Sequence, residues 1–224
     1  MRYLSYYAMW AVLALVMRYP PLLIGIVVVV ALRRVLPDPV RILQTLGRMR
    51  ELRAQVTQNP ANATARRDLA LLYLSQARPK KALVLLTDAL ARFPDDAELL
   101  YLKGLACEQA GKYEEALAPL VRAVELDPAV RFGEPYRVAG NVLRKLGRLE
   151  EAMDAYERYN ALNTSSVEGR LKLALVHHSA KDYPTARAVL ADARQTWSQL
   201  PRFKRRRELG WWMLAVLHTL RIGW

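Results

Sequence analysis

Apolar residues in the middle of the chain recur at the three- and four-residue spacing of amphipathic helices. These helical segments also repeat along the chain. The prolines Pro60, Pro94 and Pro128 follow one another at intervals of 34 residues. Four alanines keep nearly the same interval: Ala82, Ala116, Ala152 and Ala186. A period near 34 residues is that of a helix–turn–helix unit, and no such unit can bury its apolar face alone. The pattern therefore predicts an all-α stack of helical hairpins.

Aligning the four alanines places the repeat domain at 60–200, with units near 63–96, 97–130, 133–166 and 167–200. Two extra residues around Val130–Pro135 predict a local distortion between the second and third units. The stretches GKYEEAL and GRLEEAM, which begin at Gly111 and Gly147, resemble the inter-helix turn of the tetratricopeptide-repeat (TPR) family. This resemblance implies an all-α TPR solenoid of about four repeats that serves as a peptide-binding scaffold.

Residues 1–36 are predicted to anchor the chain in a membrane. Two apolar runs, 3–17 and 22–32, are separated by the sequence Arg-Tyr-Pro-Pro. Neither run alone reaches across the roughly 30 Å hydrocarbon core as a helix. A single kinked or tilted span and a short re-entrant hairpin both remain possible. Residues 37–59 would then supply a linker and an N-terminal capping helix.

The net charge of +13 is concentrated at the two ends of the chain. Residues 1–50 carry +6 and residues 201–224 carry +5, which leaves +2 for everything between them. Basic segments beside apolar ones favour an anionic membrane surface over nucleic acid as the partner. Arginines following the apolar region predict, by the positive-inside rule, that the repeat domain faces the cytoplasm. The N-terminal segment resembles the anchor of bacterial TPR proteins used in envelope assembly, which implies a bacterial inner-membrane protein.

The segment 201–224 joins a basic run to an apolar, tryptophan-rich stretch. We favour an interfacial helix whose membrane-surface residues are Lys204, Arg205, Arg206, Arg207, Trp211 and Trp212. The alternative is a cap that docks on the fourth unit through a helical stripe of Leu209, Met213, Val216 and Leu220.

The TPR resemblance also implies that the first helix of each unit lines a groove. The partner-binding candidates are Arg67, Tyr101, Arg137, Asn141, Arg144, Lys172 and His178. Arg137 and Asn141, one turn apart, resemble half of the carboxylate clamp with which some TPR domains hold a partner's C-terminus. A merely solvated basic face is the alternative.

No nucleotide-binding, nucleophile or metal-helix motif occurs, and the chain has one cysteine. We therefore expect neither an enzyme nor a bound cofactor or metal. The predicted function is a membrane-anchored adaptor that recruits a protein or peptide to the cytoplasmic membrane surface. The alternative is a structural subunit embedded in a larger membrane protein complex.

Overall fold

The computed structural model describes residues 39–59 and 61–222, so the predicted anchor at 1–36 lies outside the described residues. The chain divides into two compact units, 1–51 and 52–224. Helix α3 (Pro39–Gln58) runs through the boundary, and its last turns belong to the second unit. None of the described helices combines the length and the apolarity needed to cross a membrane.

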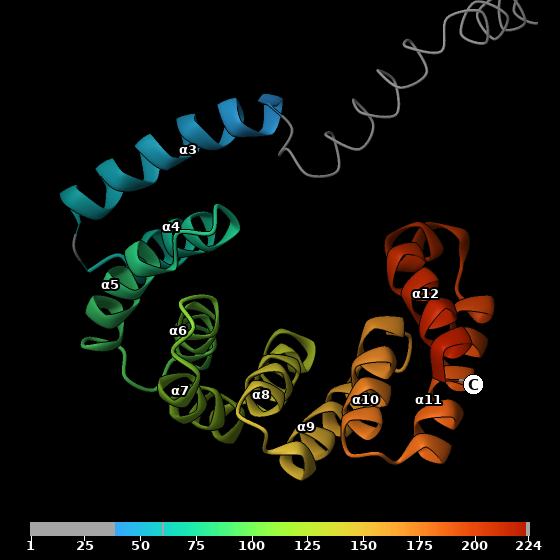
Figure 1. Ribbon diagram of the computed structural model, residues 1–224. Helices are drawn as coiled ribbons and strands as arrows, with labels where there is room; N and C mark the ends of the chain where they lie inside the picture. The colour runs from blue at the N-terminus through green and yellow to red at the C-terminus, as the bar shows by residue number, and fades with distance from the viewer. Residues whose placement is uncertain (1–38, 60, 223–224) are drawn as a thin grey trace, which may run out of the picture. The chain divides into compact units, whose positions relative to one another are not determined.

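The second unit continues with four helix pairs (Figure 1). Their bounds are α4 (Ala63–Ser75) and α5 (Pro79–Leu90), α6 (Ala97–Gln109) and α7 (Tyr113–Leu126), α8 (Glu134–Lys145) and α9 (Leu149–Leu162), and α10 (Val167–Ser179) and α11 (Tyr183–Gln199). The first helix of each pair lies on the inner side of a curved row and the second on the outer side. A 3-10 turn, η1 (Val130–Gly133), separates the second pair from the third at the place where the sequence has two extra residues.

The turn inside each pair has one residue in the left-handed conformation, two positions after the end of the first helix. Gly111 and Gly147 supply it in the second and third pairs at φ 75° and 78°, where glycine has no Cβ to clash. Ala77 and Lys181 occupy the matching positions of the first and fourth pairs, at φ 53° and 65°. All four pairs therefore share one turn geometry, although only two of them place glycine there, and only those two turns resemble the family's turn in sequence.

Small residues let the two helices of a pair approach closely. The four repeating alanines are fully buried. A Cβ added at Gly140 would lie 2.8 Å from the Tyr156 ring, and one added at Gly104 would lie 2.4 Å from Cγ of Leu120. Interiors are packed as densely as organic crystals, so no spare volume exists at these crossings.

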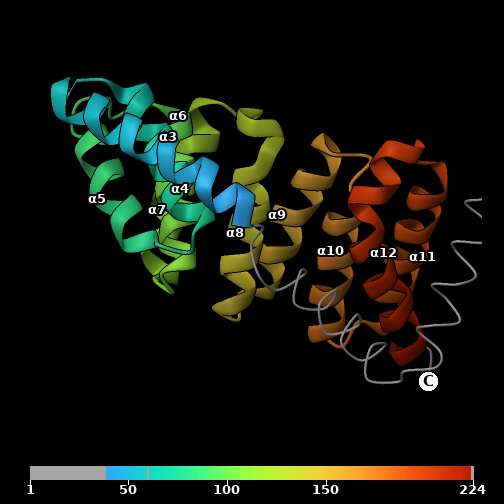
Figure 2. The same cartoon turned by 90° about the horizontal axis from the view of Figure 1, so that it is seen from above.

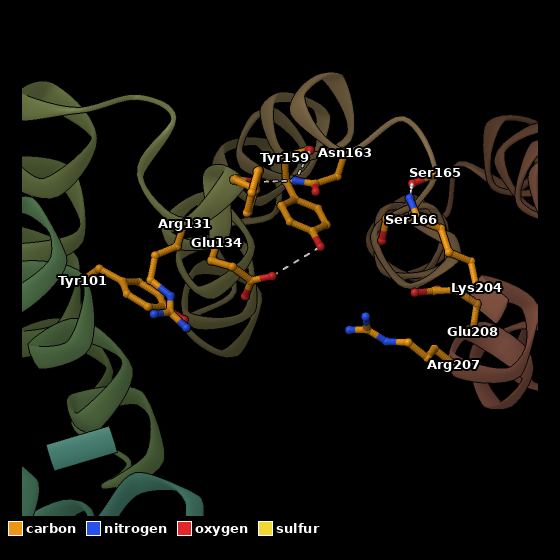
Figure 3. A pocket seen from close by; sticks show the side chains of 11 residues that line it. Tyr101, Arg131, Glu134, Tyr159, Asn163, Ser165, Ser166, Lys204, Arg207 and Glu208 are labelled. Atoms are coloured by element: carbon orange, nitrogen blue, oxygen red, sulfur yellow. Dashed lines mark hydrogen bonds between the residues drawn. The ribbon is translucent and has the colours of Figure 1, made fainter. Parts of the chain in front are cut away.

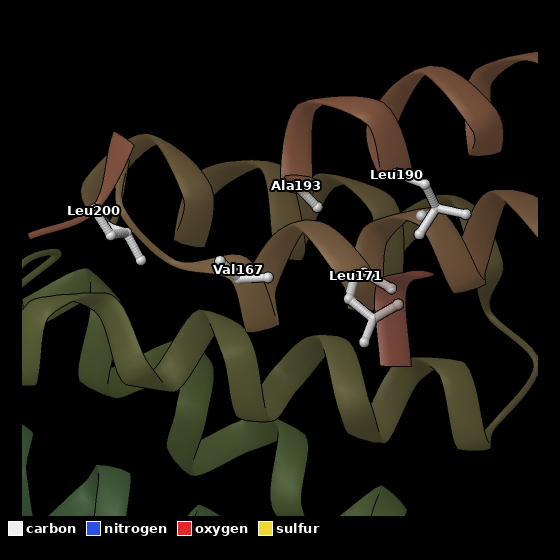
Figure 4. Close-up of a cluster of buried hydrophobic side chains, with 7 residues drawn as sticks. Val167, Leu171, Leu190, Ala193 and Leu200 are labelled. Carbon is white, nitrogen blue, oxygen red and sulfur yellow. The ribbon is translucent and has the colours of Figure 1, made fainter. Parts of the chain in front are cut away.

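Helix α12 (Arg202–Ile222) packs against α10 and α11 and closes the row, and the two views place the three helices side by side (Figures 1 and 2). Its Ala215 completes a cluster of buried side chains (Figure 4) comprising Val167, Leu171, Ala174, Leu190, Ala193 and Leu200. Trp212 stacks on Trp197 with ring centroids 4.4 Å apart. The Glu208 carboxylate accepts hydrogen bonds from the backbone N–H groups of Val167, at 3.2 Å, and Glu168, at 3.4 Å. It therefore caps the N-terminus of α10, where a negative charge is favourable.

This packing corrects the predicted docking stripe. Leu209 and Met213, which the sequence places in that stripe, are 39% and 47% exposed. The docked face is instead made by Glu208, the two tryptophans Trp211 and Trp212, and Ala215. The prediction was wrong for Leu209 and Met213, because the tryptophans hold more apolar area and take the buried side. Val216 is half-buried, and the side chain of Leu220 lies outside the described residues.

Candidate partner-binding site

Ion pairs form a ladder between neighbouring inner helices, in one group around Glu98 and another around Arg137. Glu98 of α6 bridges two arginines: Arg67 of α4 donates to Oε2 and Arg131 of η1 donates to Oε1, both at 2.8 Å. The Arg131 guanidinium also lies 5.9 Å from the centroid of the Tyr101 ring. Arg67 was predicted to face a partner, and the structure instead pairs it with the next repeat.

Arg137 occupies the centre of the ladder. Its guanidinium donates to Glu134 at 2.8 and 2.6 Å and to Glu168 at 3.3 Å. Burial alone would lower the pKa of Arg137, but hydrogen bonds and charge from Glu134, with further charge from Glu168, outweigh it and raise the pKa. Lys172 lies 2.7 Å from Glu168, and burial lowers its pKa while the Glu168 charge opposes that shift. Both cations are therefore held by carboxylates of the chain itself.

Asn141 connects two neighbouring helix pairs through hydrogen bonds. Its Nδ2 donates to Glu108 at 2.8 Å, and its Oδ1 accepts from the Tyr156 hydroxyl at 2.8 Å. Burial raises the pKa of Tyr156 to about 12. Arg137 and Asn141 thus already have partners, and the clamp-like pair predicted from the sequence is not presented as a free site. Residue spacing predicts which face of a helix a side chain occupies, but it does not show which side chains of a neighbouring helix contact it.

The remaining groove candidates stand apart from this ladder. Arg144 is exposed beside the Tyr156 hydroxyl. His178 makes an edge-to-face contact with Tyr183, with ring centroids 5.4 Å apart. Nδ1 of its neighbour His177 lies 3.1 Å from the Asp182 carboxylate.

A cleft of about 810 Å³ opens on the inner side, from α6 past the start of α8 to α12 (Figure 3). Its lining residues are Tyr101, Arg131, Phe132, Glu134, Tyr159, Asn163, Ser165, Ser166, Lys204, Arg207 and Glu208. Tyr101 is the one groove candidate among them. Burial, with a smaller contribution from Glu134, raises its pKa to about 12, so the hydroxyl remains protonated at neutral pH.

The η1 turn builds one wall of the cleft from three consecutive left-handed residues. Arg131, Phe132 and Gly133 have φ of 47°, 58° and 76°. The left-handed region costs a residue with a Cβ about 1–2 kcal/mol. The Phe132 carbonyl accepts a hydrogen bond from Asn163 Nδ2, and its side chain is 80% exposed. The turn therefore holds an aromatic ring in solvent at the mouth of the cleft.

The cleft is lined by three cations and two carboxylates. Arg131 is paired with Glu98, and both carboxylates are also engaged. Glu134 bonds Arg137, and Glu208 caps α10. Lys204 donates to Ser165 Oγ at 3.1 Å, while Arg207 is exposed and points toward the open space (Figure 3). The charge left for a ligand is positive, and guanidinium groups bind carboxylates well.

The other predicted membrane-surface residues are placed differently by the structure. Arg205 donates from Nε to the Leu200 carbonyl at 2.7 Å and from a second nitrogen to the Ser198 carbonyl. It therefore caps the end of α11. Trp211 lies under the Lys172 ammonium at 5.6 Å, and Trp212 is stacked on α11, so neither is on the outward face. Arg206 is exposed on that face.

The family follows from a sequence model of the tetratricopeptide repeat, which matches residues 67–130 and 137–201, more than half of the 224. The chain belongs to the TPR family. Its members are typically non-enzymatic scaffolds for protein and peptide interactions. Within the described residues no cluster of histidine, cysteine or carboxylate side chains could hold a metal ion.

Several solved structures share the fold. A crystal structure of MamA is 19% identical, with 67% of this chain and 87% of that chain covered and a TM-score of 0.63. A MamA structure from Desulfovibrio magneticus RS-1 is 18% identical over 72% and 93% of the two chains, with a TM-score of 0.54. YrrB, described as a TPR protein with an unusual peptide-binding site, is 21% identical over 65% and 74%, with a TM-score of 0.57. These likenesses establish the fold alone, and no curated protein sequence matches the chain.

Most of the cleft was not predicted, because it departs from the TPR repeat. Arg131 and Phe132 lie in the inserted turn, and Lys204 and Arg207 lie on the helix after the last repeat. The groove positions of a TPR unit cannot point to either segment. The two extra residues near Val130 were the available signal, and they indicated a distortion but not its left-handed conformation.

Proposed function

We propose that this chain is a membrane-anchored TPR adaptor whose inner cleft binds an acidic segment of a partner protein. Residues 1–36 would tether it to the inner membrane, with the repeats facing the cytoplasm. The observation that supports the ligand class is the combination of exposed Arg207 and Phe132 across a cleft whose carboxylates are already engaged. A carboxylate of the partner would pair with Arg207, and an apolar side chain of the partner would pack on the Phe132 ring.

The size of the cleft suits a peptide segment. Its volume of about 810 Å³ falls in the range of ligand pockets. The residues around it come from four helices, the η1 turn and the segment between α9 and α10. YrrB, which shares the fold, is described as having a peptide-binding site. Ion pairs tie η1 to α6 through Arg131 and Glu98, and α8 to α10 through Arg137 and Glu168. They would hold this side of the cleft in place, which limits the ordering cost of binding. The proposed role involves no catalytic step.

Selection of peptides from a random display library on the purified chain tests the ligand class. We expect the recovered peptides to be enriched in Asp and Glu near an aromatic or aliphatic residue. A double variant, Arg207→Glu with Phe132→Ala, should lose that enrichment, since it reverses the charge and removes the ring. Arg194→Glu is the matched control, because Arg194 is exposed on α11 and does not line the cleft.

Equal enrichment on the native chain and on the double variant would contradict the proposal. The alternative function, a structural subunit of a larger membrane complex, predicts instead that the chain leaves native membranes in detergent as part of one large assembly. Size measurement after extraction separates the two, since an adaptor should be recovered largely free of such an assembly.

A further inference from the structure

Helix α12 has an outward face that the docking on α10 and α11 leaves uncovered. Leu209, Met213 and Leu217 follow one another along this face at spacings of four residues, and Leu214 lies beside them. All four are exposed, Leu217 by 58%, and Phe203 near the start of the helix is 69% exposed. The end of a repeat stack normally presents a polar outer face to water. This face is mainly apolar along its second half.

Arginines precede the apolar residues on the same face. Arg202 and Arg206 lie one turn apart, and Arg206 is followed at three and seven residues by Leu209 and Met213. Residues at these spacings share one side of a helix. The single carboxylate of α12, Glu208, is turned away to cap α10. The outward face therefore joins guanidinium groups to apolar side chains and has no acidic group.

We propose that this face of α12 lies on an anionic lipid bilayer, with Arg202 and Arg206 on lipid phosphates and Met213, Leu214 and Leu217 at the acyl boundary. Cationic and apolar groups on one helix face are what an interfacial helix requires. A second copy of the chain fits less well, because its outward face offers no acid to pair with Arg202 and Arg206. The contact rests on the proposed tether, since the N-terminal anchor would bring α12 to the lipid surface.

The structure also changes which residues make the contact. Trp211 and Trp212 pack inward and Arg205 caps α11, so the lipid contact depends on Arg202, Arg206 and the leucines. Helix α12 docks on the repeats through one side and would contact lipid through the opposite side. Both can therefore form at once.

The position of Leu217 relative to lipid tests the proposal in the full chain. The native cysteine, Cys107, is buried, so Leu217→Cys offers an exposed thiol for an environment-sensitive fluorophore. Val84→Cys, at a 63% exposed position on α5, is the matched control. Both chains are reconstituted in phosphatidylcholine liposomes with or without phosphatidylglycerol, and a fraction of the lipids carries a nitroxide quencher near the headgroup.

We expect lipid nitroxides to quench the label at 217 severalfold more than the label at 84, and only when phosphatidylglycerol is present. Raising the salt concentration, or changing Arg202 and Arg206 to Gln, should remove most of that difference, because the attraction of arginines to an anionic leaflet is screened by salt. Flotation with the liposomes shows separately whether the chain is tethered.

Two results would overturn the inference while leaving the tether intact: a floating chain whose two labels are equally unquenched, or a label at 217 that is shielded only as protein concentration rises, which would indicate a second copy. A chain that does not float would contradict the tether and the α12 contact together.

Discussion

Replacing Asn141 by alanine should destabilise the protein, although its position in the repeat marks it as a groove residue. The side chain links Glu108 of α6 to Tyr156 of α9 through two hydrogen bonds of 2.8 Å. A hydrogen bond to a charged group contributes about 1.5–3 kcal/mol and a neutral one about 0.5–1.5 kcal/mol. The substitution should therefore cost about 2–4 kcal/mol.

The two bonds can be separated by a double-mutant cycle with Tyr156→Phe. That variant removes the hydroxyl while keeping the fully buried ring, so it should cost about 1 kcal/mol. If Asn141 and Tyr156 act through their shared bond, the double variant should be more stable than the sum of the two single effects predicts, by at least about 0.5 kcal/mol. Lys145→Ala is the control, because Lys145 is an exposed residue of the same helix.

Urea and thermal unfolding followed by circular dichroism provide the free energies. For a chain of this size 1 kcal/mol corresponds to roughly 2–4 °C in Tm. Asn141→Ala should thus lower Tm by about 5–15 °C, and Lys145→Ala should change stability by less than about 0.5 kcal/mol. If the Asn141→Ala chain were as stable as the control and showed no coupling to Tyr156, Asn141 would not stabilise the fold through these bonds. It would then again be a candidate for contact with a partner in the groove.

Three further predictions concern packing, pH and the anchor. Gly140→Ala should destabilise by about 1–3 kcal/mol in urea unfolding because its Cβ would meet the Tyr156 ring at 2.8 Å, whereas Gly210→Ala, with nothing within 4 Å, should stabilise by up to about 1 kcal/mol. Tyr101 has a folded pKa raised from 10.0 to about 12, so its stabilising contribution is complete below pH 10 and is lost as the pH rises through 12. Between pH 10 and pH 12 the free energy of unfolding should therefore fall by about 2 kcal/mol, and this loss should be absent from Tyr101→Phe. Removing residues 1–36 should abolish pelleting with membranes after a high-salt wash, and full retention of the shortened chain would mean that the anchor is assigned to the wrong segment.

The repeats could be predicted from the sequence because their signals are local. Helix α6 begins at Ala97 and is capped by Asp96, whose side chain accepts from the Leu99 N–H at 2.9 Å, and Ser166 caps α10 in the same way. Fully buried alanines at a fixed interval reveal the close crossing of each pair. Each feature depends on residues a few positions apart, which a sequence pattern can report.

The site could be predicted only in part because its contacts join residues about one repeat apart. Arg67 and Glu98 are separated by 31 residues, as are Arg137 and Glu168, and Asn141 and Glu108 by 33. A single sequence shows which face each side chain occupies but not whether the next repeat offers it a partner. Cations on the inner helices therefore resembled a ligand-binding surface, although carboxylates of neighbouring repeats hold several of them.

The η1 turn interrupts the regular pairing of side chains between repeats and lines the cleft proposed to bind a partner segment. Arg131 and Phe132 each bear the cost of a left-handed backbone, about 1–2 kcal/mol, which a regular junction between repeats avoids. The Arg131–Glu98 ion pair and the bond from Asn163 to the Phe132 carbonyl hold the turn in that conformation. Neither contact uses the Phe132 ring, which gains nothing from folding at 80% exposure. Contacts within the chain do not explain why this strain holds an aromatic group in solvent, and this observation supports the proposed contact of the ring with a bound segment.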